Sequence, residues 1–128
     1  MIILEMLTVF LLGGSAYGAI EVLWRGHTHW TMILTGGVCF ALIYLIASRS
    51  RESRLHQYIL CAAVVTTVEF LAGIVLNLKL GMDIWDYSQR RFHLLGQICA
   101  RYTLYWLILS VPACALARKL YTGLFRRL

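Results

Sequence analysis

Four long apolar runs, separated by short polar connections, account for almost the whole chain. They extend over about residues 2–24, 30–47, 57–78 and 94–116. Each run is close to the roughly 20 apolar residues that an α-helix needs to cross the hydrocarbon core of a bilayer. Because the connections are short, successive helices are expected to return in opposite directions. The pattern predicts an all-α membrane protein, a single domain over residues 1–128 with four transmembrane helices in an antiparallel bundle.

Small residues interrupt these runs at helical spacing. Gly14 and Gly18 form a GxxxG step in the first run, and Gly36 and Gly37 lie in the second. Gly96, near the start of the fourth run, is expected to give that helix a small face. Small residues let helix backbones approach one another closely inside a membrane. The first two helices are therefore expected to be antiparallel neighbours.

The composition supports a membrane class. Hydrophobic residues make up 60% of the chain and charged residues 14%, whereas soluble domains average roughly 45–50% and about 25%. The formal net charge of +6 is typical of basic residues that flank membrane helices and meet anionic lipid headgroups, so nucleic acid is not an expected partner. The sequence contains no GxxxxGK[ST] loop, so nucleotide hydrolysis would come from a partner protein.

The basic residues also predict an orientation, because Lys and Arg concentrate in cytoplasmic connections. Seven of them flank the second connection or follow the fourth run, against four beside the other two connections. The seven are Arg49, Arg51, Arg54, Arg118, Lys119, Arg126 and Arg127, and the four are Arg25, Lys79, Arg90 and Arg91. We expect both termini to be cytoplasmic in a bacterial inner membrane.

Ionisable residues lie within the apolar runs, and two of them, Glu69 and Arg101, are expected deep in the bilayer. By the rise of 1.5 Å per residue, Glu69 is expected roughly 13 Å, and Arg101 roughly 10 Å, below the outer end of its helix. A lone charge deep in a bilayer costs at least about 2.5–3.5 kcal/mol on insertion scales. The matching depths suggest that Glu69 and Arg101 face one another inside the bundle.

Further polar residues gather at the same level. Glu21 and Arg25 have the favourable acid-then-base order for an i,i+4 pair, and Asn77 shares a helical face with Glu69. The long third connection contains Trp-Asp-Tyr-Ser from residue 85, and such loops are commonly functional. One interpretation is an outward-facing polar cavity, and the other is a latch that fixes helix register. The candidate binding residues are Glu21, Arg25, Glu69, Asn77, Trp85, Asp86, Tyr87, Gln97 and Arg101.

No residue pattern predicts a metal or a cofactor. His27 and His29 form a His-x-His pair, which we interpret as polar residues that order a turn. The four cysteines are isolated in the sequence and lie in or beside apolar runs, as buried reduced thiols do. The chain also lacks a nucleophile–base signature, so we do not expect an enzyme.

Several of these residues together resemble a known family. The segments are Gly18-Ala19-Ile20-Glu21, Trp24-Arg25-Gly26-His27-Thr28-His29-Trp30, Trp85-Asp86-Tyr87-Ser88 and Gly96-Gln97-Ile98-Cys99, together with Glu69, Gly73 and Asn77. They resemble the small bacterial membrane proteins of the ABC-transporter type IV family, over nearly the whole chain. The resemblance implies a four-helix membrane fold and gives weight to Glu21, Glu69, Asp86 and Gln97.

We therefore expect a permease-like protein that binds or passes a small polar or charged solute. The expected partners are membrane lipids and either a second copy of the chain or another membrane subunit. Two alternatives remain open at this point. The chain could be a structural or assembly subunit of a membrane complex, or a small membrane enzyme that acts at the outer face.

Overall fold

The computed structural model describes residues 2–49, 53–81, 85, 93–96 and 98–125. Helices dominate it, with two short strands before the last helix. In chain order the elements are α1 (Ile2–Arg25), α2 (Trp30–Arg49), α3 (Arg54–Gly73), the π-helix η1 (Ile74–Lys79), β1 (His93–Leu94), β2 (Ile98–Cys99), α4 (Ala100–Leu120) and the π-helix η2 (Tyr121–Phe125).

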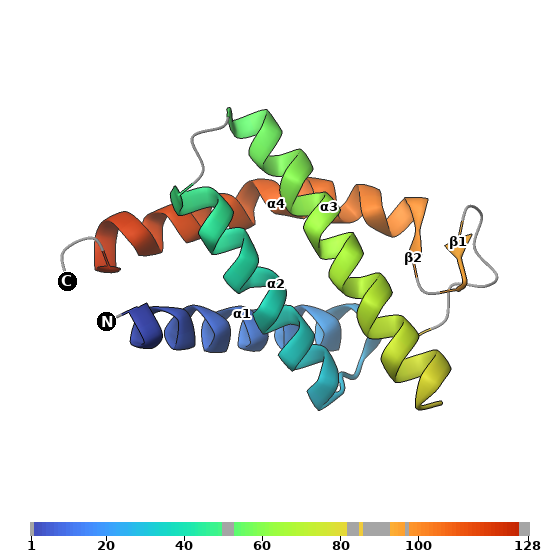
Figure 1. The fold of residues 1–128 in the computed structure, drawn as a ribbon. Helices are drawn as coiled ribbons and strands as arrows, with labels where there is room; N and C mark the ends of the chain where they lie inside the picture. Colours follow the sequence, from blue (N-terminus) through green and yellow to red (C-terminus); the bar gives the residue numbers. More distant parts are fainter. Residues whose placement is uncertain (1, 50–52, 82–84, 86–92, 97, 126–128) are drawn as a thin grey trace.

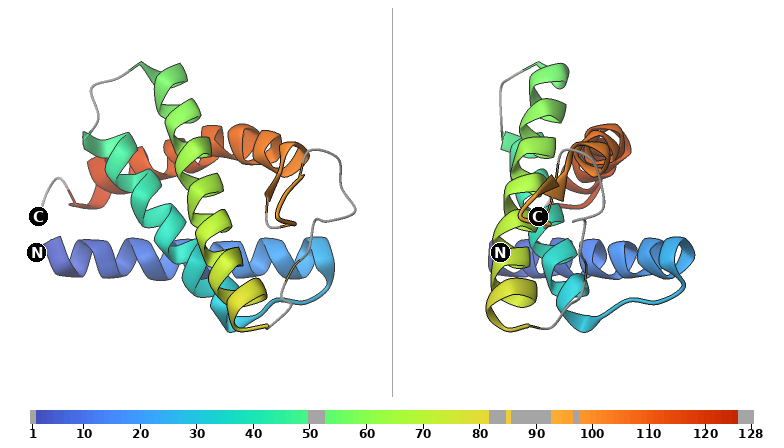
Figure 2. Two further views of the ribbon diagram at one scale, coloured as in Figure 1. Left: turned by 45° about the vertical axis from the view of Figure 1, so that its right-hand side comes forward. Right: turned by 90° about the vertical axis from the view of Figure 1, so that its right-hand side faces the viewer.

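The four long helices are each long and apolar enough to cross a membrane. The predicted all-α membrane fold with four transmembrane helices is therefore confirmed. Figures 1 and 2 show α1 and α4 running in opposite directions, while α2 and α3 lie steeply across them. An antiparallel bundle of aligned helices is not confirmed, because two of the helices cross the other two.

Helices α1 and α2 pack closely through their glycines. A Cβ atom added to Gly36 would lie 2.5 Å from the Cβ of Tyr17, and one added to Gly14 would lie 2.7 Å from the backbone oxygen of Ile33. Real Cβ atoms do not approach other atoms so closely, so only glycine fits at these positions. The small residues of the two apolar runs thus meet at one helix–helix contact, as their spacing predicted.

The third helix begins three residues before its predicted start. Ser53 is its N-cap, and the Ser53 side chain accepts a hydrogen bond from the backbone N–H of His56 at 3.3 Å. An N-cap side chain satisfies one of the N–H groups that the first helical turn leaves free. The helix then continues through η1, where the Leu80 N–H donates to the Val75 carbonyl at 2.9 Å.

The predicted start of the fourth helix, near residue 94, was wrong. Strands β1 and β2 pair there as an antiparallel hairpin, in which Leu94 lies opposite Ile98. Leu95 and Gly96 have φ angles of 53° and 73° between the strands, and a right-handed helix cannot continue through that region of φ. Gly96 is therefore a turn residue, not part of a small helical face.

This later start also changes the expected depth of Arg101. Helix α4 begins at Ala100, so the backbone of Arg101 lies in the first turn of the helix. The depth of roughly 10 Å assumed seven preceding helical residues, at 1.5 Å for each residue. The argument from matching depths therefore does not hold for Glu69 and Arg101. The side chain of Arg101 lies outside the described part of the chain.

The buried core occupies the end of the molecule that holds both termini (Figure 1). It takes residues from all four helices: Val9, Phe40, Ile43, Tyr44, Ala47, Cys61, Val65, Cys114 and Ala117. The hydroxyl of Tyr44, a fully buried residue, donates a hydrogen bond to the Glu5 carboxylate. Arg49 lies 3.9 Å from the same carboxylate. The helices are thus joined by both apolar packing and a polar contact at this end.

Candidate functional site

Two adjoining cavities lie among the crossing helices: residues of all four long helices line one, and residues of α1, α2 and α4 together with Trp85 line the other. One has a volume of about 280 Å³ and is lined by Glu69, and the other has a volume of about 350 Å³ and is lined by Glu21. We call them the Glu69 cavity and the Glu21 cavity. Their shared lining residues are Tyr17, Ile20, Met32, Trp85, Trp106 and Leu109.

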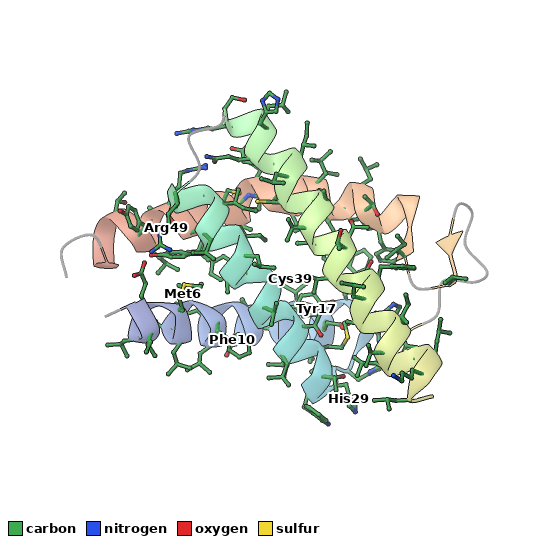
Figure 3. All side chains as sticks on the ribbon, in the orientation of Figure 1. Met6, Phe10, Tyr17, His29, Cys39 and Arg49 are labelled. Carbon is green, nitrogen blue, oxygen red and sulfur yellow. The ribbon has the colours of Figure 1, made fainter. Side chains whose placement is uncertain are left out.

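The cavities exist because α1 and α4 do not pack closely along their length. Helix α1 packs on α2, while α2 and α3 both pack on α4. Between α1 and α4, aromatic rings meet instead of backbones: Tyr17 and Trp106 have ring centroids 6.2 Å apart. Figure 3 shows Tyr17 beside Cys39, where α1 and α2 cross. Both residues line the Glu69 cavity.

Glu21 is a buried carboxylate in which only one of the two oxygens has a described partner. Its side chain is buried, and its Oε2 atom lies 3.3 Å from Nε of Arg25, one turn later on α1. Its Oε1 atom is also buried and has no hydrogen-bond partner among the described residues. A buried acceptor without a donor is costly and uncommon in folded proteins. The Glu21 cavity, which this side chain lines, is where a donor could be supplied.

Glu69 lies in the adjoining cavity and is also buried, with 6% of its surface exposed. The indole Nε1 of Trp106 donates a hydrogen bond to its Oε1 atom at 3.4 Å. One turn earlier on α3, the Thr66 hydroxyl donates to the Thr103 hydroxyl at 3.3 Å. These contacts join α3 to α4 and fix the carboxylate against the wall of the cavity.

Trp85 is a described residue of the long third connection. It is 5% exposed and lines both cavities. Its backbone N–H donates to Oδ1 of Asn77 at 3.3 Å. Asn77 is on η1, so this hydrogen bond ties the connection to the end of the third transmembrane segment. Asn77 thereby helps to position a residue that lines both cavities.

The candidate residues predicted from the sequence divide into three groups. Glu21, Arg25 and Trp85 line one cavity, and Glu69 with Trp85 lines the other. Asn77 lines neither cavity and acts through Trp85. Asp86, Tyr87, Gln97 and the side chain of Arg101 lie outside the described residues. The pairing of Glu69 with Arg101 therefore stays a prediction.

Sequence reasoning missed most of the aromatic wall. Trp24, Tyr102 and Tyr105 line the Glu21 cavity. The ring of Tyr105 lies 6.4 Å from that of Trp24 and 5.3 Å from that of Tyr102, with T-shaped geometry in both pairs. A signal was present, because Tyr102, Tyr105 and Trp106 follow i, i+3, i+4 spacing on one helical face. Such rings are also common as interfacial anchors, so this spacing alone does not indicate a cavity.

His29 of the first connection has a structural role at the start of α2. Nδ1 of His29 accepts from the backbone N–H of Thr31 at 3.2 Å and lies 2.7 Å from the Thr31 hydroxyl. His29 therefore satisfies a backbone donor at the start of α2. Among the described residues, no three His, Cys, Asp or Glu side chains are grouped closely enough to hold a metal ion.

Two cysteines that are far apart in the sequence meet in the core. The Sγ atoms of Cys61 on α3 and Cys114 on α4 lie 3.5 Å apart, and both residues are fully buried. Cys39 is partly buried beside the Glu69 cavity. Burial keeps thiols from most aqueous reagents, so the pair belongs to the packed end of the molecule and not to the cavities.

Comparison with known families identifies the chain's relatives. A family model described as "Putative ABC-transporter type IV" matches residues 6–128. The chain belongs to this family. No curated protein and no solved structure matches it. The family match agrees with the resemblance drawn from the sequence motifs, and it covers all four transmembrane helices.

Membership of the ABC-transporter type IV family and the four apolar helices together establish a membrane protein with a family name that suggests transport. The name specifies no solute. The residues that could receive one are those of the two cavities, where two buried carboxylates lie within an otherwise apolar and aromatic lining.

Proposed function

We propose that this chain is the membrane component of an ABC-type transporter, and that it binds a small polar or charged solute between α1 and α4. The observation that carries the proposal is the buried Oε1 atom of Glu21, which has no hydrogen-bond partner in the part of the chain that the structure describes. Leaving a buried acceptor unpaired costs about 1–3 kcal/mol. A solute that donates a hydrogen bond in the Glu21 cavity would remove that cost.

The two cavities suggest a route as well as a site. They share six lining residues and therefore adjoin, so in this proposal a solute moves from Glu21 to the Glu69 cavity past these shared side chains. Trp85 borders both cavities and is held by Asn77. In this proposal Trp85 controls the entry of solute into the cavities, and the carboxylates of Glu21 and Glu69 are successive binding sites. The role is binding and passage, not catalysis.

The proposal includes an orientation of the protein in the membrane. Both termini lie at the end of the molecule opposite the first connection (Figure 1). The basic residues concentrate near the termini and the second connection, and such residues favour the cytoplasmic side. With cytoplasmic termini in an inner membrane, the Glu21 cavity faces outward and the packed core lies toward the cytoplasm.

Energy and assembly would come from partners. The sequence has no phosphate-binding loop of the GxxxxGK[ST] type, so in this proposal a separate nucleotide-hydrolysing subunit drives transport. Four helices of this length form a small unit, and we propose that a second copy or another membrane subunit completes the pathway. Membrane lipids surround the remaining apolar surface.

Filling the cavities tests the proposal. Ile20 lines both cavities and is 49% exposed, while Val22 lines neither and is 47% exposed. The purified protein is screened against small amines, carboxylates and sugars for a shift in unfolding temperature. We expect one solute class to stabilise the protein, Ile20→Trp to abolish the shift and Val22→Trp to leave it unchanged.

Two results would contradict solute binding at this site. In the first, no class shifts the unfolding temperature of the wild-type protein in either detergent or lipid nanodiscs. In the second, Ile20→Trp and Val22→Trp respond alike to the stabilising solute. Because both positions are exposed to a similar extent, a general effect of a bulky side chain on folding would appear in both variants.

A structural role is the second candidate, and the hydrogen bond from Trp106 to Glu69 favours it. A buried polar pair can fix helix register without binding anything. In that case the double variant Glu69→Leu with Trp106→Phe should remain folded and should keep any measured solute binding. A solute site at Glu69 predicts that the same double variant folds but loses binding.

A further inference from the structure

The chemistry of the Glu21 cavity narrows the class of solute. Oε1 of Glu21 is a carboxylate oxygen, and a carboxylate only accepts hydrogen bonds. Its other oxygen, Oε2, already has Arg25 at 3.3 Å. A ligand that satisfies Oε1 must therefore carry an N–H or O–H group, and a group that offers only acceptors cannot replace it.

The charged side chains that line the cavities narrow the class of solute further. The described acidic and basic residues that line the two adjoining cavities are Glu21, Glu69 and Arg25. Arg25 lies beside Oε2 of Glu21, and Oε1 of Glu21 has no hydrogen-bond donor among the described residues. In a medium of low dielectric constant, a carboxylate oxygen in this position attracts cations and repels anions.

The aromatic side chains that line the Glu21 cavity also favour a cationic ligand. Trp24 and Tyr105 have ring centroids 6.4 Å apart, and Tyr102 lies 5.3 Å from Tyr105. All three rings line the Glu21 cavity. The faces of aromatic rings attract cations, most strongly when water is excluded. The remaining lining is largely aliphatic, formed by Ile20, Met32, Ile108 and Leu109.

We propose that the Glu21 cavity binds a small organic cation, namely a protonated primary or secondary amine on an apolar stem. The ammonium N–H donates to Oε1 of Glu21, and the positive charge lies against the rings of Trp24 and Tyr105. The apolar stem packs on the aliphatic side of the cavity. This inference rests on the proposed function, since it names the class of solute for that site.

The volume of the Glu21 cavity limits the size of the ligand. Ligand pockets in proteins have volumes of about 300–1,000 Å³, and the Glu21 cavity, at about 350 Å³, is near the lower limit. An amine with a single ring or a short alkyl chain fits this volume. A large polycyclic cation does not, unless α1 moves away from α4.

The experiment compares three probes that share one stem and differ in the polar head. They are phenethylammonium, phenethyl alcohol and hydrocinnamate, titrated calorimetrically into the full chain in lipid nanodiscs. We expect the amine to bind at least about tenfold more tightly than the alcohol or the carboxylate. Glu21→Gln, which keeps the size of the side chain, should weaken amine binding by a similar factor.

A second pair of variants keeps the test independent of folding at Glu21. Trp24 and Trp30 are both strongly exposed, at 69% and 64%, but only Trp24 lines the cavity. Trp24→Ala should weaken amine binding severalfold, and Trp30→Ala should not. Glu5→Gln, which removes a carboxylate at the opposite end of α1, should also leave binding unchanged.

The outcomes separate this inference from the proposed function. If the alcohol or the carboxylate binds as tightly as the amine and Ile20→Trp abolishes that binding, the cavity is a solute site but the cation class is wrong. If tetramethylammonium, which has no N–H, binds as well as the amine and Glu21→Gln has no effect, the contact with Oε1 is wrong. If none of the probes binds, the inference is overturned, while the wider solute screen still decides the function.

Discussion

The side-chain oxygen Oδ1 of Asn77 accepts a hydrogen bond from the backbone N–H of Trp85 at 3.3 Å. Asn77 belongs to the π-helical end of the third transmembrane segment, and Trp85 belongs to the connection that follows it. This amide side chain therefore helps to hold Trp85, which lines both cavities. This gives a residue outside the cavities an indirect role in them.

Replacing Asn77 should release Trp85. Asn77→Ala removes the acceptor, so we expect the Trp85 ring, now 5% exposed, to become accessible to solvent. The measurement is acrylamide quenching of tryptophan fluorescence, in a background where the exposed Trp24 and Trp30 are replaced by Phe. Asn77→Asp keeps an acceptor oxygen and should quench like the parent. Equal quenching in the alanine variant and the parent would show that other contacts hold Trp85.

The α1–α2 contact should not tolerate a methyl group. In Gly36→Ala, the new Cβ would lie 2.5 Å from the Cβ of Tyr17. Overpacking of this kind typically costs about 1–3 kcal/mol, and we expect that loss in the free energy of unfolding measured in mixed micelles. Gly123→Ala is the control, because nothing lies within 4 Å of its added Cβ. Equal stability of the two variants would contradict the close approach of α1 and α2.

Cys61 and Cys114 should form a disulfide under a membrane-permeant oxidant. Their Sγ atoms are 3.5 Å apart, and a disulfide needs about 2.05 Å, so a small shift of α3 against α4 is enough. Copper–phenanthroline would accept the two electrons, and the two thiol protons would be released. We expect two fewer free thiols in a maleimide assay and a higher unfolding temperature.

The cysteine variants provide the controls for that experiment. Cys39→Ala should leave the loss of two thiols unchanged, because Cys39 lies beside the Glu69 cavity and not in the pair. Cys61→Ala should abolish it. Oxidation that proceeds equally well in Cys61→Ala would mean that another thiol is the partner, and the observed proximity of the two sulfur atoms would have no chemical consequence.

The hydroxyl of Tyr44 should contribute to stability at the terminal end. Tyr44 is fully buried and donates to the Glu5 carboxylate, near Arg49. Hydrogen bonds to charged groups contribute about 1.5–3 kcal/mol, so Tyr44→Phe should lower the free energy of unfolding by about that amount. The measurement is chemical unfolding followed by circular dichroism.

Tyr58 offers a matched control for this prediction. It packs against the same core, and within the described part of the chain its hydroxyl has no hydrogen bond. Tyr58→Phe should therefore change stability by far less than Tyr44→Phe. A similar loss in both variants would assign the effect to ring packing and not to the contact with Glu5.

The sequence predicted the helices well because each depends on local hydropathy. It misplaced the start of α4, where Leu95 adopts a positive φ. That conformation is uncommon for a residue with a side chain, and a hairpin with two-residue strands is too short to show a period of two. Apolar composition alone could not separate these residues from the helix that follows.

The candidate site was predictable where it depends on spacing along one helix. Glu21 and Arg25 are four residues apart, and the structure brings them within 3.3 Å. Contacts between helices were not predictable in this way: Trp106 and Glu69 are 37 residues apart, and Cys61 and Cys114 are 53 apart. Such pairs depend on how α2 and α3 cross the other helices, which hydropathy does not determine.

The uneven packing of the four helices has a mechanical consequence. Core residues come from all four helices. The Glu69 cavity borders this core through Phe40 and Val65, whereas none of the core residues lines the Glu21 cavity. Separating α1 from α4 near Tyr105 and Trp24 disrupts ring contacts, whereas separating them near Val9 would expose a fully buried residue. We therefore expect the Glu21 cavity to widen more readily than the packed end of the molecule.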